Sequence, residues 1–141
     1  MKNKPVLIID DEAIIRLTLS CTLEDLGFTV EPGLTVDTVA DGEEALEKLK
    51  EKDFELAFLD LRLPGIDGFE VLRQAKKLRP GLRVIVMTAY ASVESAVNAM
   101  KLGATDFIRK PFTPQIIREA VLGVKEHERL ADVYRQRKIT Y

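Results

Sequence analysis

Three aspartates follow two of the most apolar segments of the chain, and their residue type suits phosphate chemistry. Asp10 and Asp11 come directly after Val6–Ile9, and Asp60 comes directly after Leu56–Leu59. Carboxylates that gather at one place resist joint ionisation unless a cation relieves their repulsion, and Mg²⁺ prefers such oxygen ligands. An aspartate held beside Mg²⁺ can attack a phosphoryl group and form an acyl phosphate.

A hydroxyl and an ammonium complete this set of residues. Thr88 follows the apolar segment Val84–Met87, and Lys110 follows the weaker segment Asp106–Arg109. Both could neutralise charge on phosphoryl oxygens during transfer. Each residue also has an ordinary interpretation, because aspartates often cap helices and lysines often lie in exposed loops. The combination is what indicates a phosphate-handling site.

The elements that must position these residues are short strands alternating with helices. The three apolar segments are continuous, which is typical of strands buried on both faces of a parallel sheet. Two weaker strands are expected over 35–39 and 106–109. A helix is expected after each strand, the first over 13–26. Three of the others are expected to begin at a capping residue, namely Asp41 and Asp67, each in a capping box, and Ser92.

This alternation predicts an α/β fold with a doubly wound, five-stranded parallel sheet. Its expected strand order is the flavodoxin-like 2-1-3-4-5, in which ligands bind where the carboxyl ends of the first and third strands meet. Asp10, Asp11 and Asp60 are predicted to lie at that point. Cys21 is expected to be buried in the first helix, and Val93, Val97 and Met100 form one apolar stripe on a weakly anchored fourth helix.

Composition narrows the class of protein. The 141 residues fit one domain, and 46% hydrophobic with 31% charged residues argue against disorder. A net charge of −2 disfavours a basic nucleic-acid binder, and no apolar run is long enough to span a bilayer. The single cysteine fits a reducing compartment. We therefore expect a cytoplasmic domain that binds neither nucleic acid nor membrane directly.

Four motifs lie in order within residues 4–123: Ile8–Glu12, Leu59–Gly68, Met87–Ala89 and Asp106–Phe112. In this order they resemble the motifs of bacterial response-regulator receiver domains. The stretch from Thr88–Glu94 through Lys110–Phe112 is most similar to receivers of the NtrC type, which precede an ATPase that activates transcription. The resemblance implies a CheY-like fold and a role in two-component signalling, with no enzymatic activity beyond the domain's own phosphorylation and slow dephosphorylation.

The same resemblance assigns roles to the candidate residues. Asp60 becomes the acceptor of a phosphoryl group from a sensor histidine kinase, and Lys110 pairs with that group. The peptide bond between Lys110 and Pro111 is expected to be cis. The implied Mg²⁺ ligands are Asp11, Asp60, the backbone carbonyl of Arg62, and Asp10 through water. Thr88 and Phe107 form the conformational switch, and Arg62 and Tyr90 flank the pocket where they tune the lifetime of the acyl phosphate.

Two segments depart from the family pattern. Residues 29–34 are an insertion that forms either a small hairpin on the second strand or a passive loop.

Residues 1–123 are expected to be the receiver, and residues 124–141 a helical extension. This extension is either a solvated linker to an output domain or a dimerising helix. A homodimer is therefore expected through this helix or through the face of the fourth helix, fifth strand and fifth helix. His127 lies in the extension and is interpreted as exposed and non-catalytic.

Three alternatives stay open from the residues alone. A phosphatase of the haloacid-dehalogenase type uses similar groups but needs an Asp-x-Asp pair after its first strand, whereas Asp10 and Asp11 are adjacent. A pseudo-receiver would signal without phosphate, which the presence of Asp60, Thr88 and Lys110 disfavours. A flavin-binding flavodoxin relative would need a phosphate-binding loop rich in Ser, Thr and Gly after the first strand.

Overall fold

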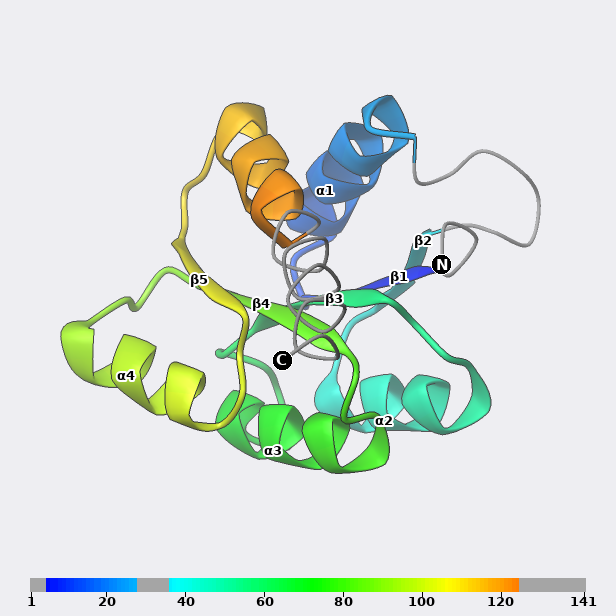
Figure 1. The fold of residues 1–141 in the computed structure, drawn as a ribbon, viewed down its shortest axis with the longest axis vertical. Coiled ribbons are helices and arrows are strands. Elements are labelled where there is room, and N and C mark those ends of the chain that lie inside the picture. Colours follow the sequence, from blue (N-terminus) through cyan, green and yellow to red (C-terminus); the bar gives the residue numbers. More distant parts are fainter. Residues whose placement is uncertain (1–4, 28–35, 125–141) are drawn as a thin grey trace, which may run out of the picture.

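The computed structural model describes residues 5–27 and 36–124, which form a parallel sheet with helices on both faces (Figure 1). Residues 114–124 are helical as well. The remaining elements are β1 (Val6–Ile9), α1 (Ala13–Asp25), β2 (Val36–Val39), α2 (Gly42–Glu51), β3 (Leu56–Asp60), α3 (Gly68–Leu78), β4 (Arg83–Thr88), α4 (Val93–Lys101) and β5 (Asp106–Arg109). The strand order is β2-β1-β3-β4-β5, as predicted.

The central strands are apolar because both of their faces are covered. Every residue of β1 and β3 is buried, which explains why these segments are continuous rather than alternating. The two strands pair in parallel with Ile9 opposite Leu59. Asp10 and Asp60 follow these partners and therefore reach the same edge of the sheet at the same level.

The helices divide into two layers. α1 and the helical residues 114–124 lie on one face of the sheet, and α2, α3 and α4 lie on the other (Figure 1). Leu19 and Leu23 of α1 share one core cluster with Ile117 and Val121. On the opposite face, α2 and α3 pack against the sheet through Leu46, Leu49, Val71 and Leu72. The sheet is thus fixed from both sides, and its carboxyl edge is left free for the site.

Helix α1 corrects the prediction for Cys21, which is exposed rather than buried. Leu19, Thr22 and Leu23 form the buried face of α1. Positions 14, 17 and 21 lie on the opposite face, because residues three and four apart share one side of a helix. Ile14 and Leu17 are accordingly 65% and 61% exposed. Apolar residues lie on both faces of α1, so the pattern did not show which face points inward.

The predicted caps are confirmed at two helices and wrong at one. The Asp41 carboxylate accepts a hydrogen bond from the Glu44 backbone N–H at 2.8 Å. Ser92 and Ser95 form a reciprocal capping box at the start of α4. Asp67 begins α3 without a side-chain hydrogen bond to the backbone. The Glu70 carboxylate, which would complete the capping box, instead accepts hydrogen bonds from Arg73 and Gln74.

Helix α4 is attached to the domain by few apolar contacts. Ala99 is its one buried residue. The stripe formed by Val93, Val97 and Met100 faces outward and not toward the core, with Val93 82% exposed. This arrangement fits the prediction of a weakly anchored helix, because little apolar surface holds α4 against the sheet.

Several predictions concern residues outside the described ranges, namely the insertion 29–34, His127, and the extension except its first residue, Val124. They stay predictions, as does the domain boundary at residue 123. Within the described ranges, no helix combines the length and apolar character needed to cross a membrane.

Candidate functional site

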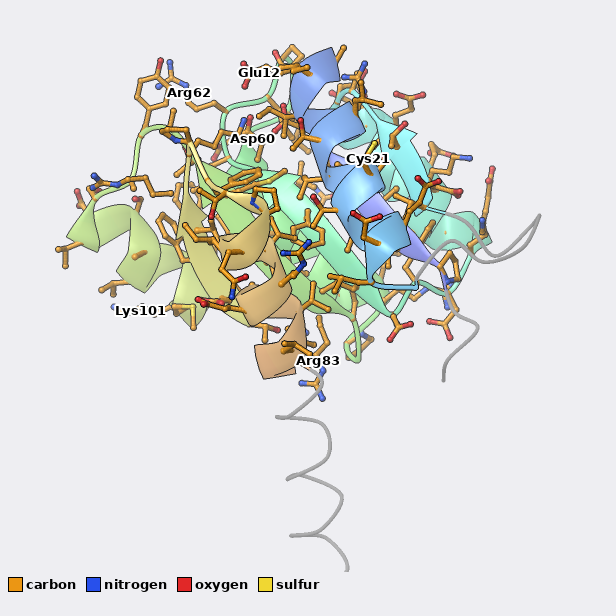
Figure 2. The ribbon with its side chains drawn as sticks, turned by 90° about the horizontal axis from the view of Figure 1, so that it is seen from above. Glu12, Cys21, Asp60, Arg62, Arg83 and Lys101 are labelled. Carbon is orange, nitrogen blue, oxygen red and sulfur yellow. The ribbon has the colours of Figure 1, made fainter. Side chains whose placement is uncertain are left out.

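The predicted site residues meet at the carboxyl edge of the sheet. Glu12, Asp60 and Arg62 lie together at one end of the molecule, and Arg83, at the start of β4, lies at the other (Figure 2). The buried polar side chains in the described part of the chain include the four at this edge: Asp10, Asp60, Thr88 and Lys110. Asp60 and Lys110 border an open hollow of about 470 Å³ that Asp11, Arg62 and Tyr90 also line.

The two buried aspartates are oriented by the same local hydrogen bond. Oδ1 of Asp10 accepts the backbone N–H of Glu12 at 2.8 Å. Oδ1 of Asp60 accepts the backbone N–H of Arg62 at 3.0 Å. Each bond links an aspartate to the residue two positions later, a turn that aspartate favours. One oxygen of each carboxylate is thereby fixed to the backbone, and the other, Oδ2, is left for the centre of the site.

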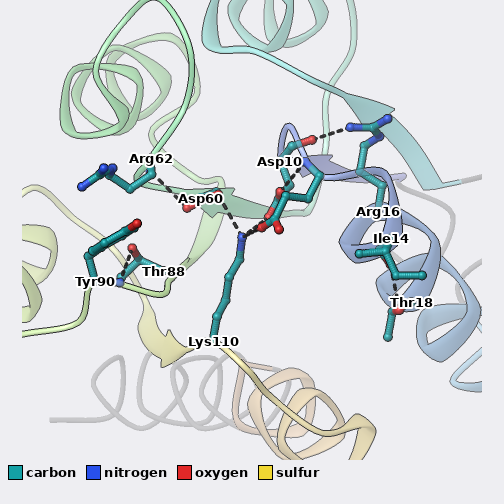
Figure 3. Close-up of polar contacts among 10 residues, drawn as sticks. Asp10, Ile14, Arg16, Thr18, Asp60, Arg62, Thr88, Tyr90 and Lys110 are labelled. Carbon is teal, nitrogen blue, oxygen red and sulfur yellow. Dashed lines mark hydrogen bonds and ion pairs between the residues drawn. The ribbon is translucent and has the colours of Figure 1, made fainter.

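Lys110 occupies that centre (Figure 3). Its Nζ donates hydrogen bonds to Oδ2 of Asp60 and to Oε1 of Glu12, each at 2.9 Å. It also lies 2.7 Å from Oδ2 of Asp10 as an ion pair. The backbone N–H of Lys110 donates to the Thr88 carbonyl at 2.9 Å, which ties the end of β5 to the end of β4. Three carboxylates therefore surround a single ammonium.

Burial and these contacts shift the pKa values of both Asp10 and Lys110. Burial raises the pKa of Asp10 above its ordinary value, and hydrogen bonds from Lys110 and the Glu12 backbone oppose that effect only in part. Burial alone would lower the pKa of Lys110, but the hydrogen bonds to Asp10, Asp60 and Glu12 outweigh it and raise the pKa. The lysine is therefore protonated at physiological pH, so its ammonium is a fixed positive charge among the carboxylates.

The donor set fits a hard divalent cation. Oδ2 of Asp10 is fully buried and is paired with Lys110 at 2.7 Å. Ligand oxygens of Asp10, Glu12 and Asp60 lie within 4.8 Å of one another. Several carboxylate oxygens around a solvent-open hollow are the ligands that Mg²⁺ accepts while it keeps some of its water. Asp11, a predicted ligand, is exposed and lines the hollow.

Arg62, Tyr90 and Thr88 form the other wall. The Arg62 guanidinium carbon lies 3.9 Å from the centroid of the Tyr90 ring, so the two side chains stack. The Tyr90 backbone N–H donates to Oγ1 of Thr88 at 3.1 Å. Figure 3 shows this pair opposite Asp10, with Asp60 and Lys110 between them. The loop that leads from β4 to α4 is thus connected to the hydroxyl expected to move.

Two further predicted features lie beside the site. The Lys110–Pro111 peptide bond is cis, as predicted. Phe107 is half-buried, packs against the core cluster on the α2 and α3 side of the sheet, and lines a groove between β5 and residues 116–120. The predicted role of Phe107 in the switch stays a prediction.

Sequence reasoning missed two residues that contact the site. Glu12 binds Lys110, although the only signal was its position directly after Asp10 and Asp11. Arg16 of α1 donates from Nη1 to the Asp10 carbonyl at 2.8 Å and so fixes the end of β1. Its spacing from Asp10 carries no recognisable pattern, so no sequence signal could have identified it.

Comparisons with known proteins agree on one family. The family model described as "Response regulator receiver domain" matches residues 6–122. The chain is 38% identical to the alginate biosynthesis transcriptional regulatory protein AlgB of Pseudomonas aeruginosa over 119 residues, which are 84% of this chain and 25% of AlgB. It is also 38% identical to the DNA-binding transcriptional regulator NtrC of Escherichia coli over 112 residues, which are 79% of this chain and 23% of NtrC. The chain thus spans about a quarter of these relatives.

Solved structures show the same fold. One is a response regulator from Burkholderia pseudomallei, described with a phosphorylated aspartic acid, a calcium ion and citrate. It is 31% identical to this chain, and the match has a TM-score of 0.74 and covers 91% of this chain and 74% of that one.

Proposed function

Because the chain belongs to the response regulator receiver domain family of two-component signalling, we propose that Asp60 accepts a phosphoryl group from a sensor histidine kinase in a Mg²⁺-dependent reaction. The observation that most directly supports this is the setting of Asp60. Its carboxylate is buried at the end of β3, oriented by the Arg62 N–H and paired with Lys110, and it borders an open hollow. No other described aspartate combines burial, a cationic partner and access from solvent.

The transfer itself is a nucleophilic displacement. A carboxylate oxygen of Asp60 attacks the phosphorus of a phosphohistidine and forms an O–P bond. The P–N bond breaks, its electron pair returns to the imidazole nitrogen, and that nitrogen takes a proton from water. Lys110 neutralises negative charge on the phosphoryl oxygens as they arrive. The products are an aspartyl phosphate on this chain and a free histidine on the kinase.

Mg²⁺ would supply charge neutralisation for the incoming phosphoryl oxygens. Asp11, Asp60 and the Arg62 carbonyl would hold it, with Asp10 acting through water. The closeness of the carboxylate oxygens of Asp10 and Asp60, which lie within 4.8 Å of each other, supports this assignment.

The response to phosphorylation would run through Thr88. Its hydroxyl would leave the Tyr90 N–H and move onto a phosphoryl oxygen, and the Phe107 ring would turn inward to fill the space. The Tyr90 N–H lies in the loop before α4, so that loop and helix would follow. The small buried surface of α4 keeps the free-energy difference between its two arrangements small.

The output of this switch is control of transcription, through an output domain or a partner, as the regulators AlgB and NtrC suggest. The domain would act in the cytoplasm, would catalyse only its own phosphorylation and slow dephosphorylation, and would bind neither nucleic acid nor membrane itself. A homodimer would form through α4, β5 and the helix that follows, where Val97, Met100 and Ile116 are exposed, or through the C-terminal helix.

The intact mass after incubation with acetyl phosphate and Mg²⁺ tests the acceptor. We expect one added phosphoryl group in the wild type and none in Asp60→Asn or without metal. Asp25→Asn, which removes an exposed carboxylate at the end of α1, is the matched control and should be phosphorylated normally. Phosphorylation of Asp60→Asn, or none of the wild type by either acetyl phosphate or a kinase, would contradict the proposal.

A further inference from the structure

The lysine and a bound cation would compete for the same oxygens. Oδ1 of Asp10 and Oδ1 of Asp60 are held by backbone N–H groups, so only their Oδ2 atoms face the centre of the site. Lys110 contacts both of these Oδ2 atoms, at 2.7 and 2.9 Å. A divalent cation that enters the site must therefore take over oxygens that Lys110 now occupies.

If a cation displaced Lys110 from these two oxygens, the lysine would lose two of its hydrogen-bond and ion-pair partners. The side chain of Lys110 is only 8% exposed, and an ammonium that loses its partners in such surroundings is strongly destabilised. Its three ion-pair partners in the described part of the chain are Asp10, Glu12 and Asp60. Of these three, Glu12 is neither the acceptor nor one of the metal ligands that the family resemblance implies, although its carboxylate lies near theirs.

Glu12 is built to remain with the lysine. Its side chain is 56% exposed, so its carboxylate is partly hydrated and can adjust its position. Its backbone is fixed at the same time, because its N–H binds Asp10 and its carbonyl accepts the N–H groups of Ile15 and Arg16 at the start of α1. A mobile carboxylate on a fixed backbone lies at hydrogen-bond distance from Nζ.

We propose that Glu12 is a positioning residue that holds the Lys110 ammonium while a divalent cation takes over the inner oxygen of Asp60 directly and that of Asp10 through a bound water. This inference rests on the proposed metal-dependent function. Glu12 acts through Lys110 and does not contact the cation itself. Its presence lowers the free-energy cost of clearing the site, so the chain binds the cation more tightly with Glu12 than without it.

Calorimetric titration with Mg²⁺ alone tests this inference without any phosphoryl donor. We expect Glu12→Gln to weaken Mg²⁺ binding several-fold, and the matched control Glu24→Gln, at the far end of the same helix, to leave it unchanged. In a Lys110→Met background the effect of Glu12→Gln should disappear, because the residue through which Glu12 acts is gone. An equal loss in both backgrounds would show direct contact with the cation and overturn the inference, as would no loss in either.

Glu12→Asp provides a test that does not depend on the Lys110 variant folding. It retains the charge but is one methylene shorter, so we expect it to resemble Glu12→Gln. Wild-type affinity in Glu12→Asp would show that only the local charge matters and would overturn the inference. Absence of Mg²⁺ binding by the wild type would instead contradict the proposed function, so the two failures are distinguishable.

Discussion

The Arg62 guanidinium stacks on the Tyr90 ring at 3.9 Å and joins the loop after β3 to the loop after β4. Both residues are exposed and both line the hollow beside Asp60. The pair therefore covers one approach by which water could reach a phosphoryl group on Asp60.

Removal of this stack should shorten the lifetime of the acyl phosphate. We expect Tyr90→Ala to accelerate dephosphorylation a few-fold, because a stack at an exposed site is worth only about 0.5–1 kcal/mol. Tyr90→Phe keeps the ring and serves as the control. The measurement is the decay of phosphorylated chain by intact mass, and equal decay in all three proteins would refute a covering role.

The hydroxyl of Thr88 should separate phosphorylation from its structural response. Thr88→Val removes the acceptor of the Tyr90 N–H, which should cost about 1 kcal/mol of stability. We expect the variant still to accept phosphate but to show smaller NMR shift changes over α4 on phosphorylation. Thr88→Ser retains the hydroxyl and should respond like the wild type. Full α4 shifts in the valine variant would exclude Thr88 as the link.

Asp10 should make the stability of the metal-free chain depend on pH. Because burial raises its folded pKa, the folded chain binds this proton more tightly than the unfolded chain does. Its stabilising contribution is complete below the ordinary pKa of 3.8 and is lost as the pH rises through the raised folded value. Asp10→Asn should therefore be more stable than the wild type at neutral pH, and the advantage should vanish at acidic pH.

Denaturant unfolding of the Asp10→Asn and wild-type chains across this pH range gives that difference directly. Asp60, Glu12 and Lys110 face the same carboxylate and are present in both proteins. A stability difference that does not change with pH would contradict the raised pKa of Asp10.

Gly68 should tolerate no side chain. A Cβ at this position would lie 2.5 Å from the Leu61 Cα and carbonyl oxygen, which are backbone atoms and cannot move aside cheaply. Gly68→Ala should cost about 1–3 kcal/mol or more and displace the loop that follows Asp60. Gly81→Ala meets nothing within 4 Å and is the control. Similar unfolding free energies for the two variants would show that the loop relaxes freely.

Most of the fold follows from hydrophobic pattern and turn chemistry. The buried strands end at aspartates, and parallel pairing of β1 with β3 is enough to place Asp10 beside Asp60. The prediction that Cys21 is buried was wrong because α1 has apolar residues on both faces, so the hydrophobic period could not identify the buried face. Glu12 was missed for a different reason, since its contact depends on Lys110, 98 positions away, and on how far that side chain extends.

The repeated turn at the ends of β1 and β3 has a thermodynamic consequence. Because a backbone N–H holds Oδ1 of Asp10 and of Asp60 in the chain without any ligand, the rotamers of both carboxylates are selected during folding. A ligand then meets side chains whose conformational entropy has already been lost, and its affinity is not reduced by ordering them. Substitutions that loosen either turn should therefore weaken binding entropically, even where every ligand atom is retained.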